Sequence, residues 1–167
     1  KLNWINQHYL KSDAPEDVAV HLLWQLERAG YAVNAGPNPA DVVVALRDRV
    51  HTLKEMADKA KVWYQPLQVE DYDQQAIAKQ LTATVRVPFE LFIAKLTMLN
   101  EWTLTNVHQA FADTLTELSL TMGKIGPAVR VAITGSTVSP SIDHTVFLCG
   151  KQQALARLNT ALSQLPQ

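Results

Sequence analysis

Apolar residues recur at intervals of three and four along most of the chain, which is the spacing of one face of an α-helix. In the first 71 residues this pattern predicts four helices. They cover Lys1 to Leu10, Pro15 to about Ala29, a segment ending near Arg49, and Thr52 to about Tyr64.

Residues that favour helix ends bracket these segments. Ser12 or Asp13 can cap the second helix, and the breaker from Gly36 to Pro39 precedes the third. Thr52 and Glu55 have the spacing of a capping box, in which each side chain accepts a hydrogen bond from a backbone N–H of the first turn. The fourth helix therefore begins at this pair.

The second half continues the helical pattern. Its predicted helices run from Asp73 to about Leu81, from Pro88, after Thr103, and from Lys151 to Leu165. The mixed polarity around Pro66 places an internal boundary near Asp71. We therefore expect two subdomains, residues 1–71 and 72–167.

Two short segments depart from this pattern. Val129, Val131 and Ile133 alternate with other residues as in a strand, and residues 144–148 are rich in strand-forming types. Local propensity thus predicts two short strands, although an isolated pair of strands is marginally stable.

Composition excludes several classes of protein. Hydrophobic residues make up 47% of the sequence and charged residues 19%, which is ordinary for a folded globular chain. With Cys149 as the only cysteine, neither an internal disulfide nor a multi-cysteine zinc site can form, and we expect a reducing cytoplasmic location without a membrane span or export signal.

Charge is unevenly distributed along the chain. The formal net charge is -1, which argues mildly against a nucleic-acid binder, because phosphate contacts come from clustered Lys and Arg. From Thr121 onward, however, four basic residues (Lys124, Arg130, Lys151, Arg157) stand against one acidic residue, Asp143. The last third of the chain is the better candidate to face an anion.

Catalytic and metal-binding patterns are weak. Ser139, Asp143 and His144 lie within six residues of one another, but a Ser-Pro pair followed by an acid is better explained as a helix start with Ser139 as its cap. The five histidines lack zinc-ligand spacing, and no glycine-rich segment matches a phosphate-binding loop. We expect neither catalysis nor a metal site in this chain.

Arg49 stands between a helix end and the capping box. From there its forked donors could contact a base edge or a phosphate, although a surface arginine favoured by the helix C-terminus is the simpler interpretation.

Three ordered segments resemble the C-terminal half of glutamyl-tRNA synthetases. They are Lys-Leu-Asn-Trp-Ile-Asn-Gln-His-Tyr-Leu at the start, Arg-Val-His-Thr-Leu-Lys-Glu from Arg49, and Met-Gly-Lys, Pro-Ala-Val-Arg-Val-Ala-Ile-Thr-Gly, Ser-Pro and Gly-Lys between Met122 and Lys151. The resemblance implies an all-α fold of two consecutive helical subdomains that form an anticodon-binding cage, so it contradicts the strand prediction.

The resemblance also implies a site and a partner. Arg49 would contact the third anticodon base, a cytosine in glutamate tRNA, and the anticodon pocket would be lined by Arg130, Ser139, Pro140 and Ile142. The catalytic signatures of the family do not occur here, so ATP and magnesium would serve the parent ligase and no cofactor would bind this fragment. We expect a monomer that binds the anticodon loop of glutamate tRNA and adjoins the catalytic domain.

Two alternatives remain open. One is a stand-alone helical module that binds a protein partner, which the near-neutral charge supports. The other is a small helical enzyme that uses Ser139 and His144.

Overall fold

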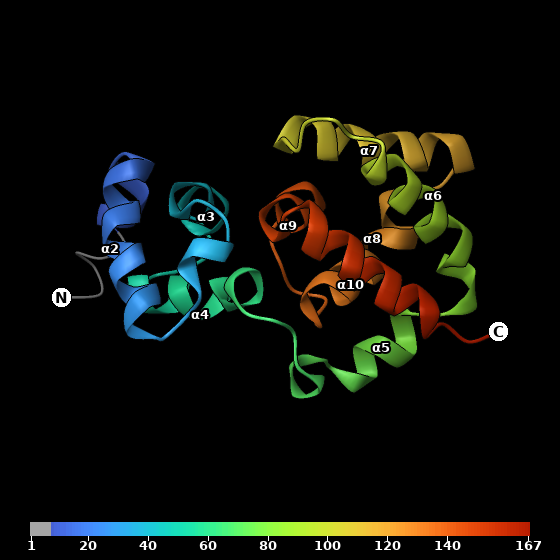
Figure 1. Cartoon of the computed structure of the whole chain (residues 1–167), viewed down its shortest axis with the longest axis horizontal. Coiled ribbons are helices and arrows are strands. Elements are labelled where there is room, and N and C mark those ends of the chain that lie inside the picture. Colours follow the sequence, from blue (N-terminus) through green and yellow to red (C-terminus); the bar gives the residue numbers. More distant parts are fainter. Residues whose placement is uncertain (1–7) are drawn as a thin grey trace. The chain divides into compact units, whose positions relative to one another are not determined.

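The structure is a computed structural model, and it describes residues 8–167. Most of the first predicted helix lies outside the described residues, while residues 8–12 are helical. The chain divides into two units, Lys1–Pro66 and Leu67–Gln167 (Figure 1). Residues 8–167 form helices and connecting segments without a strand, so the all-α prediction is confirmed.

The first unit is a small helical bundle. Helix α2 packs on both α3 and α4, and a short 3₁₀ turn, Val33–Ala35, precedes α3. These helices span Pro15–Arg28 (α2), Pro39–Leu46 (α3) and Leu53–Tyr64 (α4). Their shared core contains Val18, Leu22, Leu26, Val42, Val43, Leu46, Met56 and Trp63. Leu23, which the helical spacing also places on the inner face, is only half-buried.

The helix ends in this unit follow the expected chemistry with small differences. Ala14, rather than Ser12 or Asp13, occupies the N-cap of α2, and no side chain caps that end. At α4 the Thr52 hydroxyl accepts a hydrogen bond from the Glu55 N–H at 3.0 Å. The Glu55 carboxylate in turn accepts from the His51 N–H at 3.2 Å, one residue earlier than in a standard capping box.

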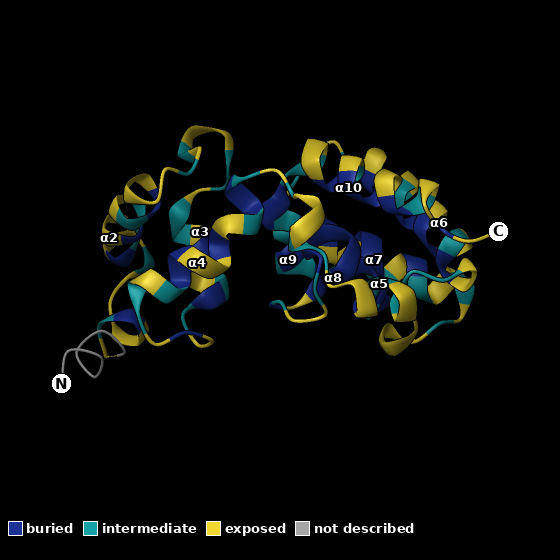
Figure 2. Cartoon of the chain, turned by 90° about the horizontal axis from the view of Figure 1, so that it is seen from below, coloured by how far each residue is buried: buried dark blue, intermediate teal, exposed yellow. Residues whose placement is uncertain are grey.

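The second unit surrounds one central helix. Helix α8 packs against α5, α9 and α10, and α6 packs against α7 and α10. Its helices span Gln74–Gln80 (α5), Arg86–Thr97 (α6), Leu104–Leu118 (α7), Met122–Thr134 (α8), Ile142–Cys149 (α9) and Lys151–Ser163 (α10). Helix α6 thus begins at Arg86, two residues before the expected start at Pro88. Figure 2 shows the buried interior of α8 and the exposed outer faces of α10 and α6.

The strand prediction for residues 128–134 and 144–148 is wrong, because both segments are helical. Val129, Val131 and Ile133 are all fully buried. Since α8 is enclosed by other helices on several sides, its sequence is apolar almost all round, and alternation along it carries no information about a strand. The expectation from the family resemblance was therefore correct.

The second unit begins at Leu67, whereas the sequence analysis places the boundary between the units near Asp71. The Asp73 N–H donates to the Gly135 carbonyl at 2.8 Å. A side chain at Gly135 would approach the Asp71 carbonyl oxygen to 2.5 Å, so the two backbones are in direct contact. This contact attaches residues 71–73 to the end of α8.

Candidate nucleic-acid interface

Arg49 lies in the turn between α3 and α4, three residues after α3 ends at Leu46. Its N–H donates to the Leu46 carbonyl at 2.8 Å, which fixes the backbone of the turn. The side chain is exposed, and among residues 8–167 it makes no hydrogen bond or ion pair. The neighbouring Arg47 is different, because it donates to the carbonyls of Leu10 and Asp13 at 2.8 and 2.5 Å. Arg47 therefore supports the fold, while Arg49 presents its guanidinium to solvent.

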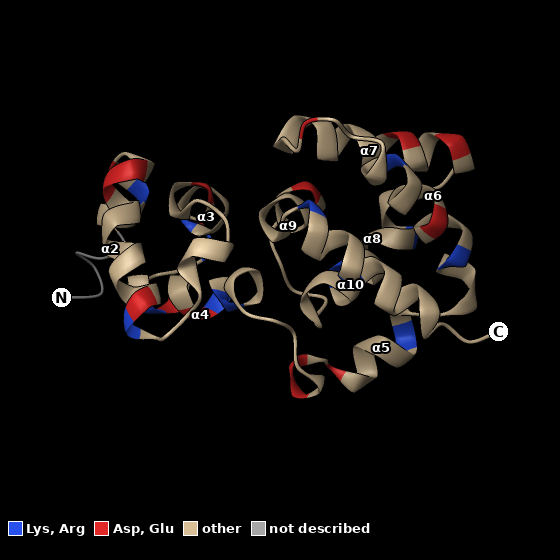
Figure 3. Ribbon diagram, viewed as in Figure 1, with Lys and Arg blue, Asp and Glu red and all other residues tan. Residues whose placement is uncertain are grey.

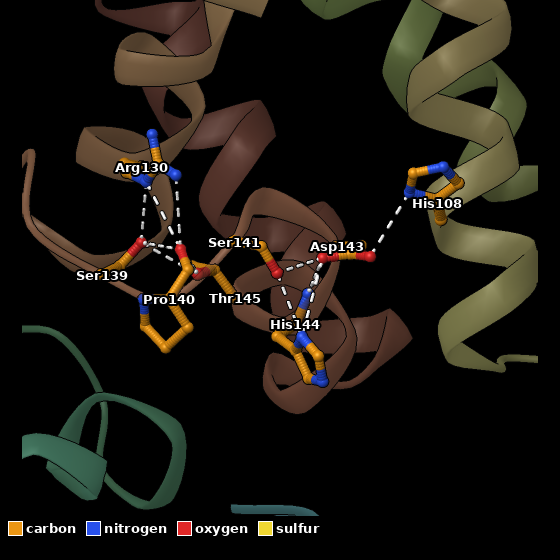
Figure 4. A network of polar contacts seen from close by, with 8 residues as sticks. All are labelled: His108, Arg130, Ser139, Pro140, Ser141, Asp143, His144 and Thr145. Atoms are coloured by element: carbon orange, nitrogen blue, oxygen red, sulfur yellow. Dashed lines mark hydrogen bonds and ion pairs between the residues drawn. The ribbon is translucent and has the colours of Figure 1, made fainter. Parts of the chain in front are cut away.

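Arg130 lies on α8 and is held by the loop that follows this helix (Figure 4). Its Nε donates to the Ser139 hydroxyl at 3.1 Å. Nε and Nη2 also approach the Pro140 carbonyl oxygen, each at 3.4 Å. The structure thus brings together three of the residues that the resemblance predicts, and their contacts within the chain hold the half-buried Arg130 side chain in place.

Thr145, which the sequence analysis does not select, completes this network. Its hydroxyl lies 3.0 Å from the Pro140 carbonyl oxygen and 2.9 Å from the Ser139 hydroxyl, which itself lies 2.9 Å from that carbonyl. Thr145 is fully buried on α9. A threonine in the first turns of a helix can bond a carbonyl that precedes the helix, and this is the signal that could have identified it.

Pro140 and Ile142 have little surface of their own. Pro140 is buried, and Ile142 is 2% exposed with its side chain directed at Gly126 of α8. Burial of Ile142 anchors the start of α9 on α8. In this conformation the surface that a ligand could contact is provided mainly by Arg130 and Ser139, which are both half-buried.

Ser139 does not cap α9, contrary to the sequence prediction. Helix α9 begins at Ile142, and its N-cap is Ser141. The Ser141 hydroxyl contacts the Asp143 carboxylate and lies 3.0 Å from Nδ1 of His144. The Asp143 carboxylate also accepts a hydrogen bond from the His144 N–H at 2.8 Å, so it satisfies a backbone N–H in the first turn of the helix.

These contacts do not form a catalytic triad. In a triad the histidine bonds the acid through one ring nitrogen and the hydroxyl through the other. Here both Ser141 and Asp143 lie on the Nδ1 side of His144, at 3.0 and 3.7 Å. The Nε2 atom is buried, and no hydrogen-bond partner for it exists among residues 8–167. The Ser139 hydroxyl contacts Arg130, Pro140 and Thr145 and not His144, so the alternative of an enzyme that uses Ser139 and His144 lacks the required geometry.

Asp143 links α9 to α7 through its second oxygen, which lies 3.3 Å from Nδ1 of the exposed His108. Partial burial raises the pKa of Asp143. The hydrogen bonds from Ser141 and from the His144 N–H, with the nearby His144 and His108 rings, outweigh that effect and lower the pKa below its ordinary value. Asp143 is thus ionised at neutral pH and stabilises the start of α9.

Charged side chains of both signs are scattered over the helices of each unit (Figure 3). Within residues 8–167 no cluster of three His, Cys, Asp or Glu side chains could hold a metal ion. Helices in this part of the chain lack the length and apolar character needed to cross a membrane. Arg49 in the first unit and Arg130 in the second are separate candidate contacts.

An all-α chain with an ordered arginine beside a Ser-Pro loop fits the helical anticodon-binding class that the sequence resemblance implies. The chain belongs to the family described as "Anticodon binding domain", whose profile matches residues 17–162. It is 51% identical over 165 residues to a glutamate–tRNA ligase of Xanthomonas campestris pv. campestris, and 48% identical to those of Stenotrophomonas maltophilia and Xylella fastidiosa. Each match covers 99% of this chain and 35% of the relative, so the chain spans about a third of the length of these ligases.

Solved structures show the same fold. A glutamate tRNA ligase from Elizabethkingia meningosepticum, in complex with its amino acid, superposes with a TM-score of 0.83 at 17% identity, covering 98% of this chain and 32% of the other. Glutamate-tRNA synthetase from Elizabethkingia anophelis gives a TM-score of 0.79 at 19% identity, covering 97% and 31%. These matches confirm the all-α fold, and the family profile with the glutamate–tRNA ligase relatives confirms the resemblance predicted from the sequence.

Proposed function

We propose that this chain recognises the anticodon loop of glutamate tRNA as part of a ligase that attaches glutamate to that tRNA. The observation that carries the proposal is the match of 99% of the chain, at 51% identity, to glutamate–tRNA ligases. The remaining part of such a ligase would contain the catalytic domain, which would use ATP and magnesium. The chain described here would contribute recognition, in a cytoplasmic and monomeric protein.

The two candidate arginines support different steps of recognition. Arg49, with its exposed guanidinium, would donate to the third anticodon base, which is a cytosine in glutamate tRNA. Arg130, held by Ser139 and Pro140, would contact the loop from a fixed position, and Ile142 would support that position by packing on α8. Unstacked anticodon bases are suited to such contacts because their edges are open to side chains.

A binding titration with two RNA stem-loops tests this proposal. The two RNAs differ only in the third anticodon base, cytosine or guanine. We expect the parent chain to prefer cytosine and Arg49→Gln to lose most of that preference, because a well-placed arginine contact to a base is worth about 1–3 kcal/mol, or about 5- to 150-fold.

Arg28→Gln is the matched control, because Arg28 is another exposed arginine of the first unit. It removes the same charge, so it should weaken binding of both RNAs equally. A chain that binds both RNAs alike, or an Arg49→Gln variant that discriminates as well as the parent, would refute the assignment of Arg49. The alternative of a helical protein-interaction module predicts no dependence on this base.

A further inference from the structure

We infer that Thr145 is a positioning residue for RNA recognition, acting through Ser139 on Arg130. This inference rests on the proposed function, because it assigns a role at the same site. Thr145 is fully buried and cannot touch a ligand. Its effect must therefore reach the surface through the groups that its hydroxyl contacts.

The contacts form a short chain from the interior to the surface. The Thr145 hydroxyl lies 2.9 Å from the Ser139 hydroxyl, and the Ser139 oxygen accepts the Arg130 Nε–H at 3.1 Å. Both hydroxyls also lie within 3.0 Å of the Pro140 carbonyl oxygen, which faces the guanidinium at 3.4 Å. Figure 4 shows Arg130, Ser139, Pro140 and Thr145 directed toward one another.

The number of protons explains why both hydroxyls are required. Each hydroxyl has one proton, so either both hydroxyls donate to the Pro140 carbonyl, whose oxygen can accept two hydrogen bonds, or one donates to that carbonyl and the other donates to its neighbouring hydroxyl. In either arrangement the Ser139 oxygen keeps a lone pair for the Arg130 Nε–H. Without the Thr145 hydroxyl, Ser139 donates to Pro140 alone and loses the contact that fixes its rotamer.

Loss of this contact should affect binding more than the fold. A loosened Ser139 holds the Arg130 guanidinium less firmly, and a side chain that must be ordered on binding lowers affinity. Thr145→Val keeps the shape of the buried side chain and removes only the hydroxyl. We expect this variant to bind the cytosine stem-loop about three- to tenfold more weakly than the parent, the effect of one lost hydrogen bond.

The experiment measures RNA affinity and urea unfolding for the full 167-residue chain. Thr145→Ser retains the hydroxyl and should bind like the parent. Thr114→Val is the matched control, because Thr114 is equally buried and its hydroxyl donates to the Ala110 carbonyl at 2.8 Å on α7. This control should lose stability to a similar degree while its RNA affinity stays unchanged.

The connection to Arg130 is tested by combining variants. In an Arg130→Gln background, Thr145→Val should cause no further loss of affinity, since the group through which it acts is absent. Ser139→Ala provides the same test from the other side of the contact if Thr145→Val does not fold.

The possible failures can be told apart. Parent-like affinity in a folded Thr145→Val variant, or in Ser139→Ala if Thr145→Val does not fold, with weak binding by Arg130→Gln, overturns this inference and leaves the proposed function standing. An undiminished effect of Thr145→Val in the Arg130→Gln background also overturns it. Parent-like affinity in Arg130→Gln overturns both the inference and the assignment of Arg130 to the site.

Discussion

Gly135 ends α8 in a left-handed conformation with φ +81° and lies against the backbone of residues 71 and 72. Gly135→Ala adds one methyl group at this contact. Its Cβ would lie 2.5 Å from the Asp71 carbonyl oxygen and 3.1 Å from the Tyr72 Cα. Because both neighbours are backbone atoms, no side-chain rotation can relieve the overlap, and the segment before α5 must move.

The expected loss of stability follows from these contacts. Holding alanine in the left-handed region costs roughly 1–2 kcal/mol. Moving the segment breaks or strains the hydrogen bond from Asp73 to Gly135, and such a bond contributes about 1 kcal/mol. Overpacking adds roughly 1–3 kcal/mol. We therefore expect Gly135→Ala to lower the free energy of unfolding by about 3–6 kcal/mol.

Gly30→Ala is the control that keeps the left-handed backbone conformation but has no contact comparable to that of Gly135 with residues 71 and 72. Gly30 has nearly the same φ, +82°, but a Cβ built there meets no atom within 4 Å. This control should lose only about 1 kcal/mol, because the steric and hydrogen-bond effects are missing and alanine also restricts the unfolded chain. Gly30 belongs to the first unit and Gly135 to the second, so each free energy is taken from the transition of its own unit.

Urea unfolding followed by circular dichroism provides the measurement. With a slope of about 1–3 kcal/mol per molar urea, a loss of about 3–6 kcal/mol moves the midpoint by roughly 1 M or more. Equal losses in Gly135→Ala and Gly30→Ala would refute the reasoning, because they would show that contact with residues 71 and 72 adds nothing to the cost of the left-handed conformation.

Two further predictions concern titratable groups. Burial raises the pKa of Cys149 to about 11, only partly offset by Arg157, and its side chain is 6% exposed. A thiolate-specific reagent at about pH 8 should therefore label Cys149 only when urea unfolds the second unit. Fast labelling of the native chain would contradict this prediction. The lowered pKa of Asp143 stabilises the fold above the unfolded-state pKa of about 4, and this contribution disappears as pH falls through the lower folded value. Between about pH 7 and pH 3, the free energy of unfolding should therefore fall less in Asp143→Asn than in the parent. Urea titrations that show the same fall in both proteins would exclude a stabilising role for the Asp143 carboxylate.

Helical spacing predicted most elements of this fold, because helices such as α2, α4 and α7 have one apolar face and one polar face. Helix α7 shows this clearly, with Val107, Ala110 and Phe111 buried on one side. Segments of α8 and α9, for which local propensity predicts strands, could not be predicted in the same way. Residues 128–134 and 145–149 are almost all buried, so their apolar residues do not mark a single helical face, and their β-branched residues favour a strand locally.

The candidate site was predicted in part. Ser139 and Pro140 were selected together, but hydrogen bonding to Arg130 and a helix start at Ile142 depend on how α8 and α9 pack, which local sequence does not determine. Thr145 was missed for the same reason, since its partners lie five and six residues away across a turn. The sequence identified the residues with suitable chemistry, and tertiary contacts decided what each of them bonds.

The different surroundings of Arg49 and Arg130 affect when each side chain loses its conformational freedom. An arginine side chain has about 2 kcal/mol of rotamer entropy to lose on becoming ordered. For Arg130 that loss accompanies folding, because Ser139 and Pro140 already hold the guanidinium. For the exposed Arg49 it would accompany binding. A substitution that loosens the loop around Ser139 would thus transfer the ordering of Arg130 from folding to binding, and affinity would fall although every contact with the ligand could still form.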